Sequence, residues 1–171
     1  ARVVGVLSGQ AANPTVGTHI MDWRNAYQSA NAYAIAPYFG YSHGSSPKAE
    51  AALGLTIDQF MNLLETQDLP ASIGWMQANA AETARRGIQL IAYEGGQHLA
   101  ADYAHENIAA LNAVFDAANL HPRMQTIYMK YLQAWRNAGG RYFAHFLSVG
   151  TWSKHGRWGA LRDLYQAPST A

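Results

Sequence analysis

The sequence contains no cysteine and little charge, and both absences exclude classes of function. Without cysteine, the 171-residue chain can form no disulfide framework and perform no thiolate chemistry. Charged residues make up only 13% of the chain, well below the usual quarter, and the net charge is +1. No run of Lys and Arg gives a nucleic-acid footprint, and no apolar run reaches membrane-spanning length. We therefore expect neither a nucleic acid nor a membrane as a partner.

The residues that take the place of charge are apolar and aromatic. Hydrophobic residues account for 49% of the chain, which includes 10 Tyr and 5 Trp. Such a surface suits neutral, hydroxyl-rich ligands, and it equally suits burial against a partner or against missing residues. The length predicts a single domain over residues 1–171. The absence of cysteine does not decide the compartment, although it is compatible with export. We expect a secreted or periplasmic location.

Short apolar runs alternate along the chain with segments of helical periodicity. The runs lack clean period-2 alternation, which is typical of parallel strands buried on both faces. The predicted strands are 3–7, 33–38, 88–93 and 142–147. Predicted helices cover 14–29, the segment after a capping box at Thr56 and Gln59, 71–86, 101–118, 121–139, and a short segment after Trp158. Residues 40–55 form a predicted long loop. This order indicates an α/β fold of four parallel βα units.

Polar and aromatic side chains follow each predicted strand. Gln10, Tyr38, Glu94 and Trp152 come after the first, second, third and fourth strands in turn. Because the carboxyl ends of parallel strands share one edge, we expect these side chains to converge on a single cleft.

Glu94 is the most informative of these residues, because a charged group at the tip of a buried strand needs a partner or a function. It follows the apolar run 88–92 and precedes two glycines, Gln97 and His98. One interpretation is a catalytic carboxylate. The alternative is a structural carboxylate that caps a helix, pairs with an arginine or is held by Tyr38.

Three motifs resemble the C-terminal half of a (β/α)8-barrel (TIM-barrel) glycoside hydrolase of the retaining clan A type, and more closely bacterial cellulose-binding or glycosidase-like barrel proteins. They are Ala-Pro-Tyr-Phe-Gly at 36–40, Tyr-Glu-Gly-Gly-Gln-His at 93–98 and Trp-Ser-x-x-Gly-x-Trp-Gly at 152–159. The resemblance implies a (β/α)4 half-barrel over 1–171, equivalent to strands five to eight. It also implies a β-linked polysaccharide, such as cellulose or hemicellulose, as the ligand, and no cofactor.

The resemblance assigns roles to three residues. Glu94 matches the nucleophile at the end of strand seven, Tyr38 the tyrosine that hydrogen-bonds it, and Trp152 the floor of the sugar subsite. Gln10 has no counterpart with a defined role, and it is expected to contact substrate from its strand end. The acid/base of this clan ends strand four, which this chain does not contain. Whether the chain is an enzyme therefore stays open, and a carbohydrate-binding module that pairs with another half-barrel is the alternative. Partners would be a second copy or an N-terminal half-barrel.

The remaining candidates carry two interpretations each. Gln97 and His98 either bind sugar hydroxyls or serve as capping and supporting residues. A metal site from Glu94, His98 and His105 lacks a tight ligand motif, and none is predicted. Trp158 is expected to pack against the last helix. Helical stripes place Trp23, Trp75 and Trp135 in the core, and Arg85 and Arg86 form a predicted solvated helix end.

Overall fold

The computed structural model describes residues 3–166, which form two compact units. Unit 1 comprises residues 3–37, Ala71–Gly95 and Tyr131–His145. Unit 2 comprises Tyr38–Pro70, Gly96–Lys130 and residues 146–166. The ends of the predicted half-barrel, residues 1–2 and 167–171, lie outside the described residues.

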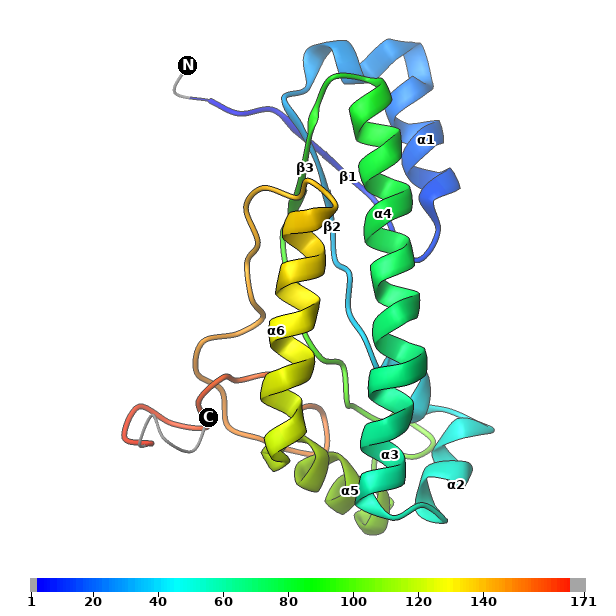
Figure 1. Ribbon diagram of the computed structural model, residues 1–171, viewed down its shortest axis with the longest axis vertical. Helices are drawn as coiled ribbons and strands as arrows, with labels where there is room; N and C mark the ends of the chain where they lie inside the picture. The colour runs from blue at the N-terminus through cyan, green and yellow to red at the C-terminus, as the bar shows by residue number, and fades with distance from the viewer. Residues whose placement is uncertain (1–2, 167–171) are drawn as a thin grey trace. The chain divides into compact units, whose positions relative to one another are not determined.

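Unit 1 contains a small parallel sheet in the order β1-β2-β3 (Figure 1). The strands are β1 (Val6–Ser8), β2 (Ala32–Ile35) and β3 (Gln89–Ala92), and Tyr33 of β2 lies opposite Leu7 and Leu90. All of β2 is buried, whereas Val6 on β1 is 47% exposed. The fold is therefore mixed α/β with sequential parallel strands, as the alternation of elements predicts.

The fourth predicted strand is reduced to a single parallel bridge between Ala92 and Phe143. Ala92 N–H donates to the Tyr142 carbonyl at 2.9 Å, and Ala144 N–H donates to the Ala92 carbonyl at 3.1 Å. Phe143 turns its ring toward Tyr131, whereas Tyr142 is 80% exposed. Within the predicted range 142–147, Phe143 is the one residue that forms a bridge, so the full strand is not formed.

The first helix of unit 1 is shorter than its predicted range of 14–29. Pro14 opens α1 (Pro14–Asp22), as the sequence predicts, but a 3₁₀ segment, η1 (Trp23–Ser29), follows. Arg24 and Asn25 adopt positive φ angles of 47° and 57°, which breaks the α-helical stripe at this point. Trp23 is consequently 66% exposed, and its predicted core position is wrong.

The helix ends marked by glycine agree with the sequence prediction. The helix α4 (Leu69–Arg85), most of which belongs to unit 1, stops before Gly87 at φ +67°. The helix α6 (Pro122–Asn137) stops before Gly139 at φ +88°. Both glycines adopt the left-handed conformation that terminates helices. The last turn of α6 places Trp135 in the core of unit 1, as predicted.

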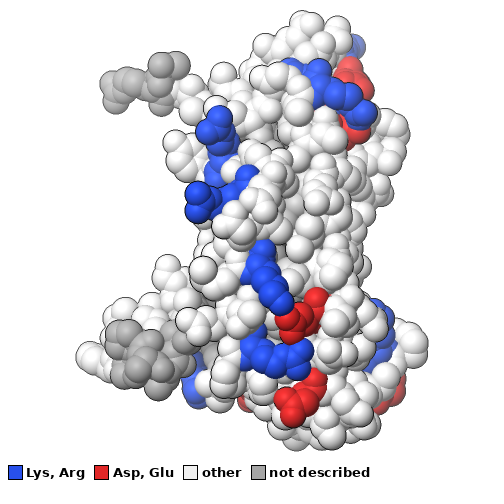
Figure 2. Space-filling model, in the orientation of Figure 1, with Lys and Arg blue, Asp and Glu red and all other residues white. Residues whose placement is uncertain are grey.

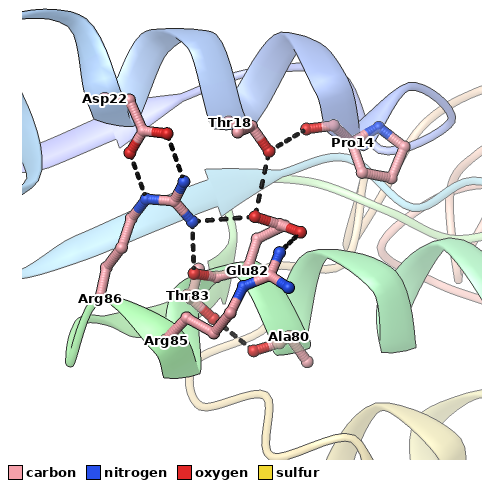
Figure 3. A network of polar contacts seen from close by, with 8 residues as sticks. All are labelled: Pro14, Thr18, Asp22, Ala80, Glu82, Thr83, Arg85 and Arg86. Carbon is pink, nitrogen blue, oxygen red and sulfur yellow. Dashed lines mark hydrogen bonds and ion pairs between the residues drawn. The ribbon is translucent and has the colours of Figure 1, made fainter.

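Arg86 is not the solvated helix end that the sequence predicts. It donates two hydrogen bonds of 2.7 Å to the Asp22 carboxylate at the end of α1 and one of 2.9 Å to Glu82 of α4 (Figure 3). Thr18 Oγ1 also donates to Glu82 at 3.1 Å. These bonds to Arg86 hold the pKa of Asp22 below its ordinary value. The pair Arg86–Asp22 is a bidentate link between α1 and α4 within unit 1.

Unit 2 is built from short helices joined by ordered turns. They are η2 (Tyr41–Gly44), α2 (Lys48–Leu53), α3 (Ile57–Leu63), a π-helical turn η3 (Leu64–Asp68), α5 (Ala109–Leu120) and the first part of α6. The predicted capping box of Thr56 and Gln59 at the start of α3 is confirmed. The predicted loop 40–55 thus contains η2 and α2.

Two helical predictions in unit 2 are wrong. The helix expected from residue 101 begins only at Ala109, because Asp102 Oδ1 accepts the backbone N–H groups of Ala104 and His105 and stabilises a turn instead. No helix follows Trp158 as far as residue 166.

Among residues 3–166, no helix is long and apolar enough to cross a membrane. Figure 2 shows the low charge of the chain as a largely uncharged face.

Candidate functional site

Glu94 lies in unit 1, two residues after the end of β3, and is partly buried. Its backbone is well fixed, because Tyr93 N–H donates to the Ile35 carbonyl at 3.2 Å. A Cβ atom at Gly95 would lie 2.6 Å from the Phe143 ring, so the next position has no room for a side chain. Within residues 3–166, the Glu94 carboxylate has no hydrogen bond and no ion pair. The structural alternatives of a helix cap or an arginine pair therefore have no support there.

Gln10 lies in the same unit, at the same edge of the sheet. The Gly9 N–H donates to the Ala34 carbonyl at 3.1 Å and extends β1 by one residue beyond its assigned end. Gln10 is exposed directly after this bond. Gln10 and Glu94 thus follow the carboxyl ends of β1 and β3, the outer strands of the sheet.

The other predicted site residues, Tyr38, Gln97, His98 and Trp152, belong to unit 2. The ring centroids of Tyr38 and His98 are 5.3 Å apart, and those of His98 and Trp158 are 5.4 Å apart, both in edge-on geometry. Phe146 continues this aromatic row, 5.8 Å from Trp158. Trp158 thus packs among aromatic rings, whereas the last helix against which it is expected to pack does not form within residues 3–166. A row of aromatic rings is also chemistry that suits the C–H faces of sugars.

Gln97 is buried, and its side-chain amide forms hydrogen bonds with backbone groups of unit 2. Its Nε2 donates to the Arg157 carbonyl at 2.7 Å, and its Oε1 accepts the Leu99 N–H at 2.6 Å. The backbone N–H of Gln97 also donates to Tyr128 Oη at 2.9 Å. These contacts favour the supporting role of Gln97 over direct contact with a sugar.

Trp152 is partly buried, and the guanidinium of Arg162 lies 4.4 Å from the centroid of its ring. Its indole Nε1 is buried and has no hydrogen-bond partner in the described part of the chain, and the same holds for Trp158 Nε1. A buried N–H without an acceptor costs free energy.

Of the three strands of the described sheet, only β3 has a carboxylate among the two residues that follow it. Gly9 and Gln10 follow β1, and Ala36 and Pro37 follow β2. Among residues 3–166, no group of three or more His, Asp or Glu side chains is arranged to hold a metal ion. Glu94 belongs to unit 1, whereas His98 and His105 belong to unit 2.

Sequence reasoning missed a second polar cluster, formed within unit 2 by Ser46, Glu50, Asp102 and His105. The local signals for it are the spacing of three residues between Asp102 and His105 and of four residues between Ser46 and Glu50. The contact with Ser46 spans 59 positions along the chain.

Comparisons with protein-family models, with curated proteins and with solved structures found no match for this chain.

Proposed function

We propose that the chain is a (β/α)4 half-barrel that acts on or binds β-linked polysaccharide. The sequential parallel order of β1, β2 and β3 supports the half-barrel, since each neighbouring pair is joined through a helical crossover. The isolated parallel bridge of Phe143 to Ala92 also supports the half-barrel, because it stands beside β3, where a fourth strand would pair. A secreted or periplasmic location fits such a substrate.

One observation carries the proposed chemistry: a carboxylate without a partner follows a strand of a parallel sheet. In a retaining glycosidase, the nucleophile attacks the anomeric carbon while a second carboxyl group protonates the leaving oxygen. Glu94 takes the nucleophile's place in this proposal. The second carboxyl group would come from the preceding half of a complete barrel, because no other described strand end supplies one.

Hydrolysis of an aryl β-glucoside tests the catalytic role of Glu94. We expect Glu94→Gln to lower kcat/KM at least about 100-fold, because an amide cannot form the glycosyl-enzyme bond. An activated 2-fluoro glycoside should add its sugar mass to the peptide that contains Glu94. The matched control is Asp58→Asn, since Asp58 is a 79% exposed carboxylate in the first turn of α3. Full activity of Glu94→Gln, or no labelling of the peptide that contains Glu94 in the unchanged chain, contradicts the enzymatic proposal.

The alternative is a carbohydrate-binding module without turnover that pairs with another half-barrel. The aromatic row of unit 2 favours binding. The outer edge of β1 favours pairing, because β1 is hydrogen-bonded on one side only and Val3, Val4 and Val6 are exposed. We propose a second copy of the chain as the partner at this edge.

Affinity electrophoresis in soluble β-glucan, combined with light scattering, tests this alternative. We expect β-glucan to retard the protein. Trp152→Ala should weaken the retardation about tenfold, because the loss of one stacking contact on an aromatic side chain costs about 1–3 kcal/mol. Trp23→Ala is the control, because Trp23 is exposed and belongs to unit 1. The expected mass in solution is that of a dimer. A monomeric mass argues against pairing with a second copy, and a mobility that β-glucan does not change argues against carbohydrate binding.

A further inference from the structure

The polar cluster of Ser46, Glu50, Asp102 and His105 has the connectivity of a nucleophile, a base and an orienting acid. His105 Nε2 lies 3.2 Å from Ser46 Oγ, and His105 Nδ1 lies 2.6 Å from Asp102 Oδ1. Both distances fall within hydrogen-bond reach. All four residues belong to unit 2, and their segments follow β2 and β3 in the chain.

The imidazole of His105 is held in a fixed orientation. Asp102 Oδ1 accepts the backbone N–H groups of Ala104 and His105, each at 3.0 Å, in addition to the His105 ring. His105 is only 9% exposed, so its ring has little freedom to rotate. Ser46 is exposed, which leaves its hydroxyl oxygen accessible from solvent. This is the division of roles that defines a serine triad by geometry rather than by sequence position.

We propose that Ser46, His105 and Asp102 form a hydrolytic triad that cleaves small carboxylic esters by acyl transfer. The Ser46 hydroxyl first turns its hydrogen from Glu50 Oε1 to His105 Nε2. Ser46 Oγ then forms a bond to the acyl carbon while its proton passes to His105 Nε2. The ester C–O bond then breaks, and the leaving alkoxide takes that proton. Water attacks the acyl-serine, His105 removes its proton, and Ser46 Oγ leaves and takes the proton back, which releases the acid. This activity is separate from the proposed glycoside chemistry of Glu94.

Glu50 regulates this triad. Ser46 Oγ donates to Glu50 Oε1, which also lies 3.1 Å from His105 Nε2. The serine hydroxyl and the neighbouring imidazole lower the pKa of Glu50 to about 2, so Glu50 is ionised at neutral pH. Asp102 and Glu50 together raise the pKa of His105. His105 is therefore a base only above this raised pKa, and ester hydrolysis is expected to increase as the pH rises through it.

The residue after the nucleophile limits the substrate class. That residue commonly donates its backbone N–H to the oxyanion. Here it is Pro47, which has no N–H. With this donor missing, the tetrahedral intermediate is less stabilised. Esters with good leaving groups, rather than amides, are therefore the substrates that we expect.

Labelling and kinetics on the full chain test the triad. We expect a fluorophosphonate to add its mass to the peptide that contains Ser46, and 4-nitrophenyl acetate to be hydrolysed above the buffer rate. Ser46→Ala should abolish labelling and lower the rate at least about 100-fold, whereas Ser45→Ala in the same loop should leave both unchanged. Labelling at another serine, or no labelling, overturns the proposal.

The pH profile separates catalysis from a merely structural role. Glu50→Gln removes one of the two carboxylates beside His105, so the midpoint of the pH–rate profile should move to lower pH. Asp102→Asn should move the midpoint to lower pH as well, because Asp102 also raises the pKa of His105, and it should in addition lower the rate on the high-pH plateau at least about tenfold, because the imidazole loses its orientation. A profile that Glu50→Gln leaves unchanged contradicts the arrangement, even if the rate itself falls.

Discussion

Replacing Arg157 with methionine is expected to lower the free energy of unfolding by about 3 kcal/mol or more. The Arg157 side chain is only 2% exposed within unit 2. It donates to the Leu99 carbonyl at 3.0 Å and to Asn112 Oδ1 at 3.0 Å, and its Nε donates to Asp116. Methionine fills much of the apolar volume but donates to none of these oxygens. The Leu99 carbonyl would then be buried without this donor, and burial of an unsatisfied acceptor is costly.

Urea unfolding followed by circular dichroism measures this effect. Arg136→Met is the control, since Arg136 is exposed in the last turn of α6 and its loss should cost only a few tenths of a kcal/mol. Equal stability of the two variants would show that Arg157 is not required as a buried donor.

The second large effect is expected at Trp135, where substitution by alanine should cost about 3–5 kcal/mol. Trp135 is 2% exposed in unit 1, and its ring centroid lies 5.4 Å from that of Phe143. Its Nε1 donates to the Arg141 carbonyl at 3.2 Å. The backbone turn at Gly140 packs directly on the indole, because a Cβ atom there would lie 2.2 Å from the ring. Removal of the indole leaves a cavity and an unbonded carbonyl together.

Thermal or urea unfolding of Trp135→Ala, compared with Trp23→Ala, checks this prediction. Trp23 is 66% exposed and should change the free energy of unfolding by no more than about 0.5 kcal/mol. If both variants lose a similar free energy of unfolding, the buried Trp135 stabilises the protein no more than the exposed Trp23 does, and the prediction is wrong.

Sequence reasoning succeeded where a local signal determines the backbone. The glycines at 87 and 139 end α4 and α6, and the capping box of Thr56 and Gln59 begins α3. The order of the parallel strands also follows from the alternation of apolar runs and helices. These features depend on a few neighbouring residues, so the sequence contains the information directly.

Other features depend on contacts that no local pattern shows. The helical stripe of Trp23 fails because Arg24 and Asn25 turn to positive φ. The helix predicted over 101–118 loses its first part because the Asp102 side chain competes for backbone N–H groups. Residues 142–147 look like a strand by composition, yet only Phe143 pairs.

The candidate site divides in the same way. The position of Glu94 at the tip of β3 follows from its apolar run and the glycines after it. The hydrogen bond from Gln97 to the Arg157 carbonyl could not be predicted in this way, since the two residues are 60 positions apart. Ser46 and His105 are similarly far apart in the sequence, and they come into contact only because the two turns that contain them lie side by side.

The ring of Tyr33 restricts which sequences the fold accepts. This buried strand residue ends against two glycines, and a Cβ atom would lie 2.2 Å from its hydroxyl oxygen at Gly9 and 2.4 Å at Gly17. The hydroxyl itself has no hydrogen-bond partner within the described residues, so shape rather than bonding ties the three positions together. The residues accepted at positions 9 and 17 during evolution therefore depend on the residue at position 33. Alanine can replace either glycine only after Tyr33 has been replaced by a smaller side chain.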